Sequence, residues 1–224
     1  MADAATQARR AFPDTSVLSP ISLLDLMMRL AEHRIHDLVW SDDLLDELDR
    51  TWREGRAAGK RVPNETGAAA ALAGIRRTFN DTRMDRASYQ HLVDTMPGTD
   101  EDDRLHSAAA RAGDATHIVT TDRAGGFPVA ELAAFGLRVQ APDDYLTEIA
   151  RELPTDCRRI VSEMVEQRRQ RDPTLSVDQL VERWRSRVGL THFCEQLMNA
   201  EPDVERGPGS GERAAHPDQP PPQP

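Results

Sequence analysis

The sequence predicts an α/β protein in which a parallel sheet is followed by a carboxyl-terminal segment built of helices alone. Short apolar strands alternate with helices up to about residue 142, a pattern typical of parallel sheets covered by helices. After Pro142 the spacing of apolar residues is helical throughout. The chain has 224 residues, which allows one domain with a real core and a smaller appendage.

Composition limits the class of protein. A formal net charge of −10 argues against binding nucleic acid through charge alone, but not against a metal-dependent enzyme, because divalent ions can supply the positive charge. No apolar run approaches the roughly 18 residues that span a bilayer, and residues 1–10 lack a hydrophobic leader, so we expect no membrane contact and a cytoplasmic protein. Cys157 and Cys194 fall in helical patterns and are expected to be reduced thiols.

The amino-terminal elements begin after a leader of ten residues. Residues 11–18 are predicted to be extended, because Pro13 restricts the backbone, and Asp14 lies near the end of this segment. Residues 21–31 are apolar on most faces and predict a buried helix. Ser41 is a cap for the next helix, in which Glu47 borders the apolar face. Its carboxylate is either a solvated flank or aimed at a site.

Residues 55–67 are predicted to be a loop, a candidate flap with positive charge at Lys60 and Arg61. A small helix is expected over residues 68–77. The most unusual stretch comes after Pro97, where four acids occupy residues 100–103. Two unit charges about 4 Å apart cost roughly 4 kcal/mol at an effective dielectric near 20. Water compensates them if the run is an exposed loop, and a cation does so if other carboxylates converge on it.

Thr99 or Asp100 is the candidate cap of a helix that ends at Gly113. A strand follows over residues 116–121 and leads to Asp122; a helix over 129–134 and a strand over 137–140 complete the α/β layer. The later helices begin near residue 143, span 155–169, open at Ser176 with a capping box, and span 191–199. We divide the chain into a leader (1–10), an α/β domain (11–142), a helical extension (143–200) and a disordered proline-rich tail (201–224).

Three carboxylates fall where ligands gather in α/β proteins, at the carboxyl ends of strands. Asp14 and Asp122 follow strands, and Asp103 lies at the start of the helix that leads into the second of them. Glu47 can join from its helix. Oxygen ligands without matching cysteine or histidine suit Mg²⁺ or Mn²⁺, which favour phosphoryl transfer. Aspartates after strands are common, so spacing alone leaves open whether these acids form a site.

Four motifs of the sequence resemble those of PIN-domain ribonucleases and occur in the same order. More narrowly they resemble the VapC-type toxins of bacterial toxin–antitoxin pairs, in the subgroup with an extra carboxyl-terminal helical segment. The resemblance covers about residues 11–198. The motifs are Phe12-Pro13-Asp14-Thr15-Ser16-Val17-Leu18, Trp40-Ser41-Asp42-Asp43-Leu44-Leu45-Asp46-Glu47-Leu48, Asp100-Glu101-Asp102-Asp103-Arg104, and Ile118-Val119-Thr120-Thr121-Asp122 with Phe127-Pro128.

The resemblance implies a three-layer α/β PIN-like domain with an all-helical extension. It assigns the four catalytic, metal-binding acids and three auxiliary residues in the following order: Asp14, Glu47, Asp103 and Asp122, then Asp100, Ser16 and Thr120. The implied activity is a divalent-metal (Mg²⁺ or Mn²⁺) endoribonuclease acting on tRNA or another structured RNA. The implied partner is a cognate antitoxin that binds DNA, and a homodimer is a further expectation.

Two departures from the family pattern are visible. Gly126 occupies the place before Phe127 where the family usually has an aspartate, and the first strand lacks the usual run of aliphatic residues. We therefore keep an alternative, a catalytically weak or inactive PIN-like module that binds a protein. A small-molecule phosphatase fits the acids but lacks a second aspartate at the usual spacing from Asp14.

The remaining candidate residues are basic side chains and histidines. Candidate RNA contacts are Lys60, Arg61, Arg168 and Arg169, although solvated helix faces with ion pairs are the favoured interpretation of the arginines. His106, like His117, is interpreted as an ordinary structural residue, because a cage of carboxylates does not need it.

Overall fold

The computed structural model describes residues 9–122 and 126–199. Its central sheet has four parallel strands in the order β2-β1-β5-β6, and a separate pair, β3-β4, is also parallel. The strands are β1 (Arg10–Pro13), β2 (Asp37–Leu38), β3 (Trp40–Ser41), β4 (Arg83–Met84), β5 (His117–Val119) and β6 (Arg138–Gln140). An all-parallel sheet of this kind confirms the predicted fold class.

Strand β1 lies inside the sheet, between β2 and β5. Ala11 pairs with Leu38 on one side, and Phe12 pairs with Ile118 on the other. All four side chains are buried, as expected for a sheet covered on both faces. The short first strand therefore pairs normally without its aliphatic run. Because β1 and β5 are adjacent and parallel, the residues that follow them emerge at the same edge of the sheet.

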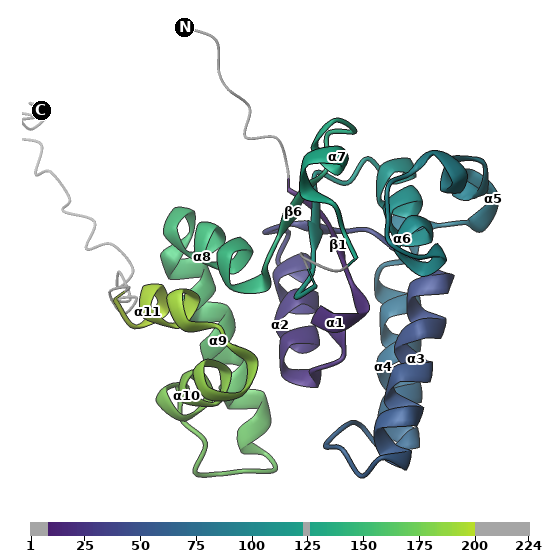
Figure 1. The fold of residues 1–224 in the computed structure, drawn as a ribbon. Helices are drawn as coiled ribbons and strands as arrows, with labels where there is room; N and C mark the ends of the chain where they lie inside the picture. The colour runs from purple at the N-terminus through teal and green to yellow at the C-terminus, as the bar shows by residue number, and fades with distance from the viewer. Residues whose placement is uncertain (1–8, 123–125, 200–224) are drawn as a thin grey trace, which may run out of the picture.

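Helices cover the sheet on both sides (Figure 1). Figure 1 shows α3, α4, α5 and α6 on one side, with α2 and the carboxyl-terminal helices on the other. The helices of the α/β part are α1 (Thr15–Leu18), α2 (Ile21–Glu32), α3 (Asp42–Ala57), α4 (Glu65–Thr78), α5 (Arg86–Tyr89), α6 (Glu101–Ala112) and α7 (Val129–Ala133), with 3-10 turns η1 (Asn80–Thr82) and η2 (Gln90–Thr95).

The predicted loop over residues 55–67 is wrong at both ends. Helix α3 continues to Ala57, and Gly55 lets Val62 approach closely, since a Cβ at position 55 would lie 2.9 Å from Val62 Cγ1. Helix α4 begins early because the Asn64 side chain accepts a hydrogen bond from the Gly67 N–H. The connecting segment is therefore residues 58–64, and it carries Lys60 and Arg61.

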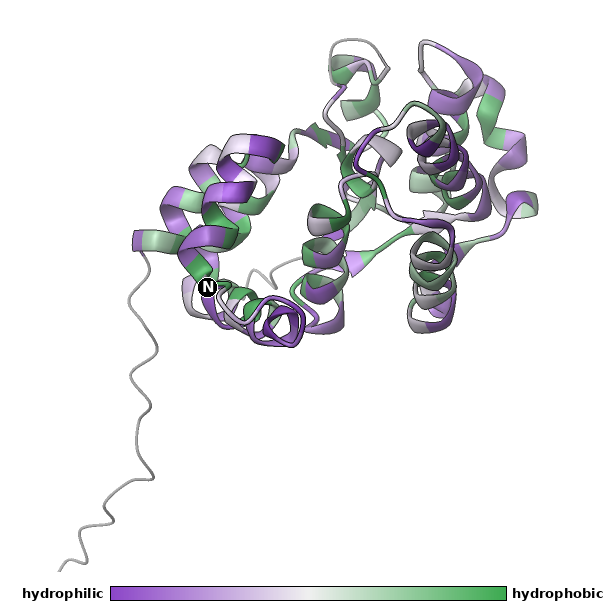
Figure 2. Ribbon diagram, turned by 90° about the horizontal axis from the view of Figure 1, so that it is seen from below, coloured by the Kyte–Doolittle hydropathy of each residue, from purple (hydrophilic) through white to green (hydrophobic). Residues whose placement is uncertain are grey.

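The carboxyl-terminal segment is helical, as predicted. Its helices are α8 (Pro142–Glu152), α9 (Pro154–Arg169), α10 (Val177–Val188) and α11 (Thr191–Asn199). Ser176 and Gln179 form the expected capping box at the start of α10. The cysteines at 157 and 194 are free and buried. In Figure 2 each of these helices carries both hydrophobic and hydrophilic residues, as amphipathic packing requires.

Polar contacts join this segment to α2. Arg168 Nη2 lies 2.8 Å from Asp25 Oδ2, and His33 Nε2 lies 3.0 Å from Glu163 Oε2. Among the described residues, every helix is too short or too polar to span a lipid bilayer. The predicted tail, residues 201–224, and nearly all of the predicted leader lie outside the described residues.

Candidate metal and nucleic-acid site

Asp14 joins the sheet to the first helix. The prediction that residues 11–18 are extended is wrong beyond Pro13, because the Asp14 carboxylate accepts the Ser16 N–H and caps α1. Its Oδ2 also accepts hydrogen bonds from the hydroxyls of Ser16 (2.6 Å) and Thr120 (2.9 Å). Burial raises the pKa of Asp14, but hydrogen bonds from His106, Ser16 and Thr120 outweigh this and leave the pKa below its ordinary value. Asp14 is therefore held as a carboxylate.

Thr120 and Asp122 follow strand β5 at the same edge. The Asp14 N–H donates to Val119 O at 2.8 Å, which fixes the two strand ends together. The Thr120 hydroxyl accepts the Asp122 N–H at 3.0 Å while it donates to Asp14. Thr120 is fully buried and Asp122 is exposed. One hydroxyl thus links the two acids that follow the strands.

The acidic run of residues 100–103 opens helix α6. Asp100 accepts the Asp103 N–H at 2.9 Å, and Asp103 accepts the Asp100 N–H at 3.2 Å, a reciprocal capping box. Asp102 pairs with Arg50 at 3.1 Å. Burial raises the pKa of Asp103, with further contributions from the charges of Asp100 and Asp14. Helix N–H groups and one arginine therefore compensate much of the charge in this run.

Glu47 reaches the same place from α3. Its Oε2 accepts a hydrogen bond from the Thr15 hydroxyl at 2.9 Å. Burial raises the pKa of Glu47, and the nearby His106 and the Thr15 hydrogen bond oppose this only in part. Of the two interpretations open for Glu47, the structure supports the inward carboxylate.

His106 lies between two of the acids, and its interpretation as an ordinary structural residue is wrong. Its Nε2 lies 3.1 Å from Glu47 Oε2, and its Nδ1 lies 3.5 Å from Asp14 Oδ1. Burial lowers the pKa of His106, but the two carboxylates outweigh burial and raise it. A sequence signal was available, because His106 follows Asp103 by three residues and so lies on the same face of the helix.

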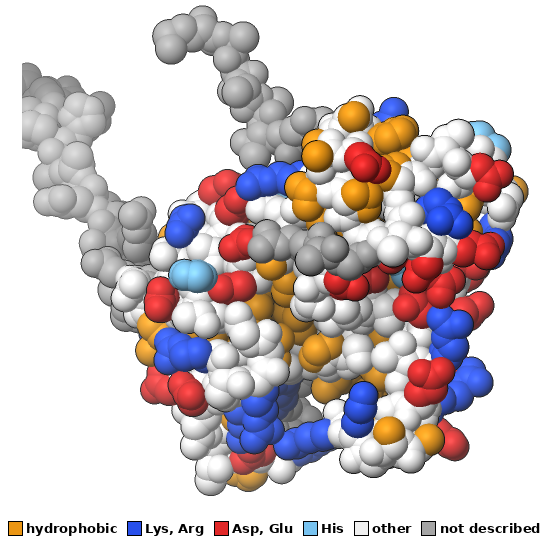
Figure 3. All heavy atoms as spheres, in the orientation of Figure 1, with side chains coloured by type: hydrophobic (Ala, Val, Ile, Leu, Met, Phe, Trp, Pro, Cys, Tyr) orange, Lys and Arg blue, Asp and Glu red, His pale blue; other side chains and the backbone are white. Residues whose placement is uncertain are grey.

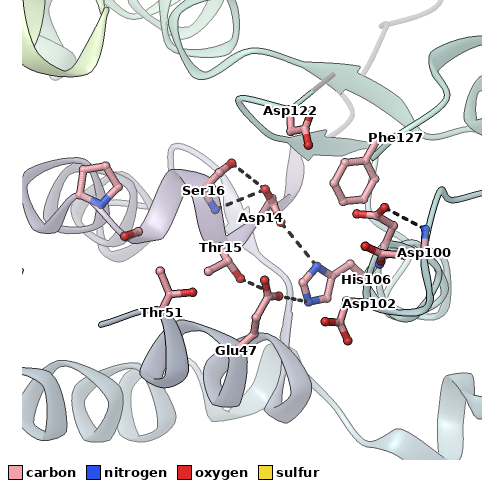
Figure 4. Close-up of a pocket in the computed structure, with 13 residues that line it drawn as sticks. Asp14, Thr15, Ser16, Glu47, Thr51, Asp100, Asp102, His106, Asp122 and Phe127 are labelled. Atoms are coloured by element: carbon pink, nitrogen blue, oxygen red, sulfur yellow. Dashed lines mark hydrogen bonds and ion pairs between the residues drawn. The ribbon is translucent and has the colours of Figure 1, made fainter. Parts of the chain in front are cut away.

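The acidic cleft, as we call it, is the hollow of about 470 Å³ that these side chains line. Figure 4 shows carboxylates from the end of β1, α3, the start of α6 and the segment after β5 around one space, with Phe127 beside it. The lining residues are Asp14, Thr15, Ser16, Ser19, Pro20, Glu47, Thr51, Asp100, Asp102, Asp103, His106, Asp122 and Phe127. All the predicted acids and Ser16 line it, and Thr120 bonds Asp14 from behind.

Gly126 lies against Asp103. A Cβ at position 126 would be 2.6 Å from Asp103 Oδ1, so any larger residue there would displace this carboxylate. The Thr99 N–H donates to Gly126 O at 3.3 Å and joins this turn to the start of α6. Gly126, which replaces the usual aspartate, therefore leaves the space that the Asp103 carboxylate occupies.

The donor set of the acidic cleft fits a hard divalent cation, because it consists of carboxylates, one of them deeply buried and held ionised. The carboxylates are too far apart to form a complete set of metal ligands in this structure. Among the described residues, no three histidine, cysteine or acidic side chains lie close enough together to hold a metal ion. His106 lies between two of these acids and contacts both Asp14 and Glu47.

The four predicted RNA-binding residues do not lie in one place. Arg61 and Arg168 line a second groove, between α2 and the helices α9 and α10. Arg169 does not line it; its Nε donates to Leu175 O and its Nη1 pairs with Glu166. Lys60 lines neither this groove nor the acidic cleft.

The chain matches a model of the PIN domain over residues 11–124. No curated protein and no solved structure matches it. PIN domains are generally metal-dependent nucleases, and the match spans both strands that carry Asp14 and Asp122. Because this match covers half of the chain, the protein belongs to the PIN domain family.

Proposed function

We propose that this protein is a divalent-metal-dependent endoribonuclease that hydrolyses phosphodiester bonds of tRNA or another structured RNA. The observation that carries the proposal is the convergence of Asp14, Glu47, Asp103 and Asp122 on one cleft at the carboxyl ends of β1 and β5. Open α/β sheets place their ligands at this edge. RNA phosphates would be repelled by four acids alone, so a cation is needed for the cleft to accept them.

Asp14, Asp103 and Asp122 would hold Mg²⁺ or Mn²⁺, with Glu47 beside them. Bound there, the ion supplies positive charge for the phosphate and acidifies a water molecule. The protein's contribution is positioning. Ser16 and Thr120 fix the Asp14 carboxylate, and the capping box fixes the direction of Asp103. Thr15 holds Glu47 toward the cleft. By resemblance to the family, the products are a 3′-hydroxyl and a 5′-phosphate.

RNA cleavage tests this proposal directly. The purified protein should cut RNA in Mg²⁺ or Mn²⁺ and lose this activity in chelator and in Asp14→Asn. Asp46→Asn is a matched control, because Asp46 lies beside Glu47 on α3 but is exposed and does not line the acidic cleft. Intact RNA at saturating metal would contradict the proposal.

Asp103→Asn tests the assignment of the metal ligand separately. The amide keeps a capping oxygen and removes a charge, so it should stabilise the metal-free protein and abolish a rise in melting temperature with Mg²⁺. A wild-type melting temperature that millimolar Mg²⁺ leaves unchanged would favour solvated acids over a metal site.

The biological role we propose is that of a cytoplasmic toxin held inactive by a cognate, DNA-binding antitoxin, and it rests on the motif resemblance to VapC-type toxins. Expression of the chain alone should stop bacterial growth, and Asp14→Asn should restore it. Co-expression of a small DNA-binding protein encoded beside it should also restore growth. A homodimer would appear in light scattering of the purified protein.

A catalytically inactive PIN module that binds a protein is the alternative. Two observations favour it: His106 contacts both Asp14 and Glu47, and a glycine replaces the usual acid at position 126. The cleavage assay separates the two functions, since this alternative predicts intact RNA together with binding of a protein partner.

A further inference from the structure

A second groove, of about 800 Å³, lies between the α/β domain and the carboxyl-terminal helices. One wall comes from the start of α2, the other from the end of α9 and from α10, and Arg61 reaches in from the segment 58–64. Five arginines line it, and we call it the arginine groove: Arg61, Arg168, Arg171, Arg183 and Arg187. Figure 3 shows Lys and Arg side chains around a hollow at the lower middle of the molecule, below the acidic residues.

The charge of the arginine groove is only partly neutralised within the described chain, where Arg183 pairs with Asp172 at 3.5 Å. Arg61, Arg171 and Arg187 are exposed and form no ion pair with any described residue. Arg168 pairs with Asp25 at 2.8 Å, and Asp25 is the single acidic residue among the described lining residues. A groove of this charge, in a protein with a net charge of −10, is suited to an anion.

The floor of the groove is apolar. Leu24 and Met28 of α2 and Leu180 of α10 are buried there, and Ile21 at its edge is 46% exposed. A small inorganic anion would make no favourable contact with an apolar floor. A single-stranded nucleic acid would contact both parts of the groove, because its phosphates pair with cations while its bases pack on apolar surface and on the flat faces of arginines.

The arginine groove adjoins the acidic cleft at Pro20. Pro20 lines both hollows, with Ser19 in the cleft and Ile21 in the groove. Trp52, fully buried in α3, donates from Nε1 to Ser19 O at 2.9 Å and fixes this junction. The two hollows are therefore neighbours, on either side of the α1–α2 junction.

We propose that the arginine groove binds the sugar-phosphate backbone of single-stranded RNA on one side of the phosphate that is cleaved. The inference rests on the proposed function and gives the substrate a defined path. An acidic amphipathic helix of a protein partner would also match basic walls and an apolar floor. The position of the groove beside the acidic cleft favours RNA, since a protein partner would not need to lie next to the cleft.

Binding is measured in Mg²⁺ in an Asp14→Asn background, so that cleavage cannot interfere while the cation offsets the remaining acids of the cleft. The probe is a fluorescent single-stranded RNA of about 20 nucleotides, longer than one binding site. The test variant is Arg171→Gln/Arg187→Gln. The charge-matched control is Arg77→Gln/Arg185→Gln, because both arginines are exposed and lie outside the acidic cleft and the groove. Equal melting temperatures of the two variants exclude a folding defect.

The test variant should bind RNA about tenfold more weakly at ~0.1 M salt, and its slope of log K against log salt should fall by about 1.4, or ~0.7 for each lost phosphate contact. The control should keep both values. Unchanged affinity and slope in the test variant, or no binding of RNA by the parent Asp14→Asn protein in Mg²⁺, would overturn the inference.

The outcomes also separate this inference from the proposed nuclease. RNA binding that depends on Arg171 and Arg187, without cleavage in Mg²⁺, supports the groove and contradicts the nuclease. Cleavage that the test variant retains at wild-type kcat/KM overturns the groove and leaves the nuclease standing. An acidic helical peptide that binds the wild type but not the test variant, with RNA binding unaffected in both, would assign the groove to a protein and overturn the inference.

Discussion

The imidazole of His106 lies 3.1 Å from the carboxylate of Glu47, and its other nitrogen faces Asp14. Because the pKa of His106 is raised by these two acids, its protonated form gives the cleft an internal cation. A divalent ion brought to Asp14 must act against this arrangement.

His106→Gln should lower the free energy of unfolding of the metal-free protein by about 1–3 kcal/mol, since two partly buried carboxylates lose their partner. The same change should enlarge the rise in melting temperature with Mg²⁺, because the ion then supplies the missing charge. Denaturant unfolding and thermal melting measure both effects. His91→Gln is the control, since His91 is exposed. An equal Mg²⁺ response in wild type and His106→Gln would contradict the competition between histidine and metal.

Gly126→Ala should separate function from stability. Its Cβ would lie 2.6 Å from Asp103 Oδ1, and the end of a side chain can move at small cost. We expect little change in melting temperature but a clear loss of metal binding and RNA cleavage, measured by calorimetric titration and by kcat/KM. Gly74→Ala, where the added carbon meets nothing within 4 Å, should instead stabilise helix α4 by about 0.5–1 kcal/mol. Full activity in Gly126→Ala would show that the position of Asp103 is unimportant.

Thr120→Val removes the hydroxyl that links Asp14 to Asp122 and keeps the shape of the side chain. Groups that orient metal ligands typically change metal affinity by about 10–100-fold when they are lost, and we expect a weakening in this range. Thr121→Val is the matched control, because the neighbouring Thr121 side chain is exposed. If both variants bind Mn²⁺ equally well, Thr120 has no orienting role.

His36 should make the protein sensitive to acid. Burial lowers the pKa of His36 to about 4, and its ring contacts Tyr145 Oη at 2.7 Å and Met27 O at 3.0 Å. A lowered pKa means that the unfolded state binds the proton more readily. The stabilisation is therefore complete above about pH 6.5 and is lost as the pH falls toward 4, by roughly 3 kcal/mol. Urea unfolding across this range should show a shallower dependence on pH for His36→Gln than for wild type, and an identical slope would contradict the role of His36.

Local sequence determined most of the elements and the direction of the key acids. Asp100 and Asp103 form a capping box within one turn, and Ser176 with Gln179 forms another, because these hydrogen bonds join residues three apart. The caps at Ser41 and the helices after Pro142 follow from equally short-range patterns. The motifs that resemble those of PIN-domain proteins assign Asp14, Glu47, Asp103 and Asp122 to one site from sequence alone.

Only the tertiary structure decided what lies among these acids. His106 contacts Asp14 across 92 positions of the chain, and no local pattern indicates which strand end its helix will cross. The arginine groove likewise joins Arg61 to arginines of α9 and α10, which are far apart in the sequence. Arg168 faces the groove while the adjacent Arg169 turns to Leu175. The direction of each of these side chains depends on how whole helices pack. Burial of the apolar face fixes the orientation of a helix, and this orientation then determines where its charged residues lie.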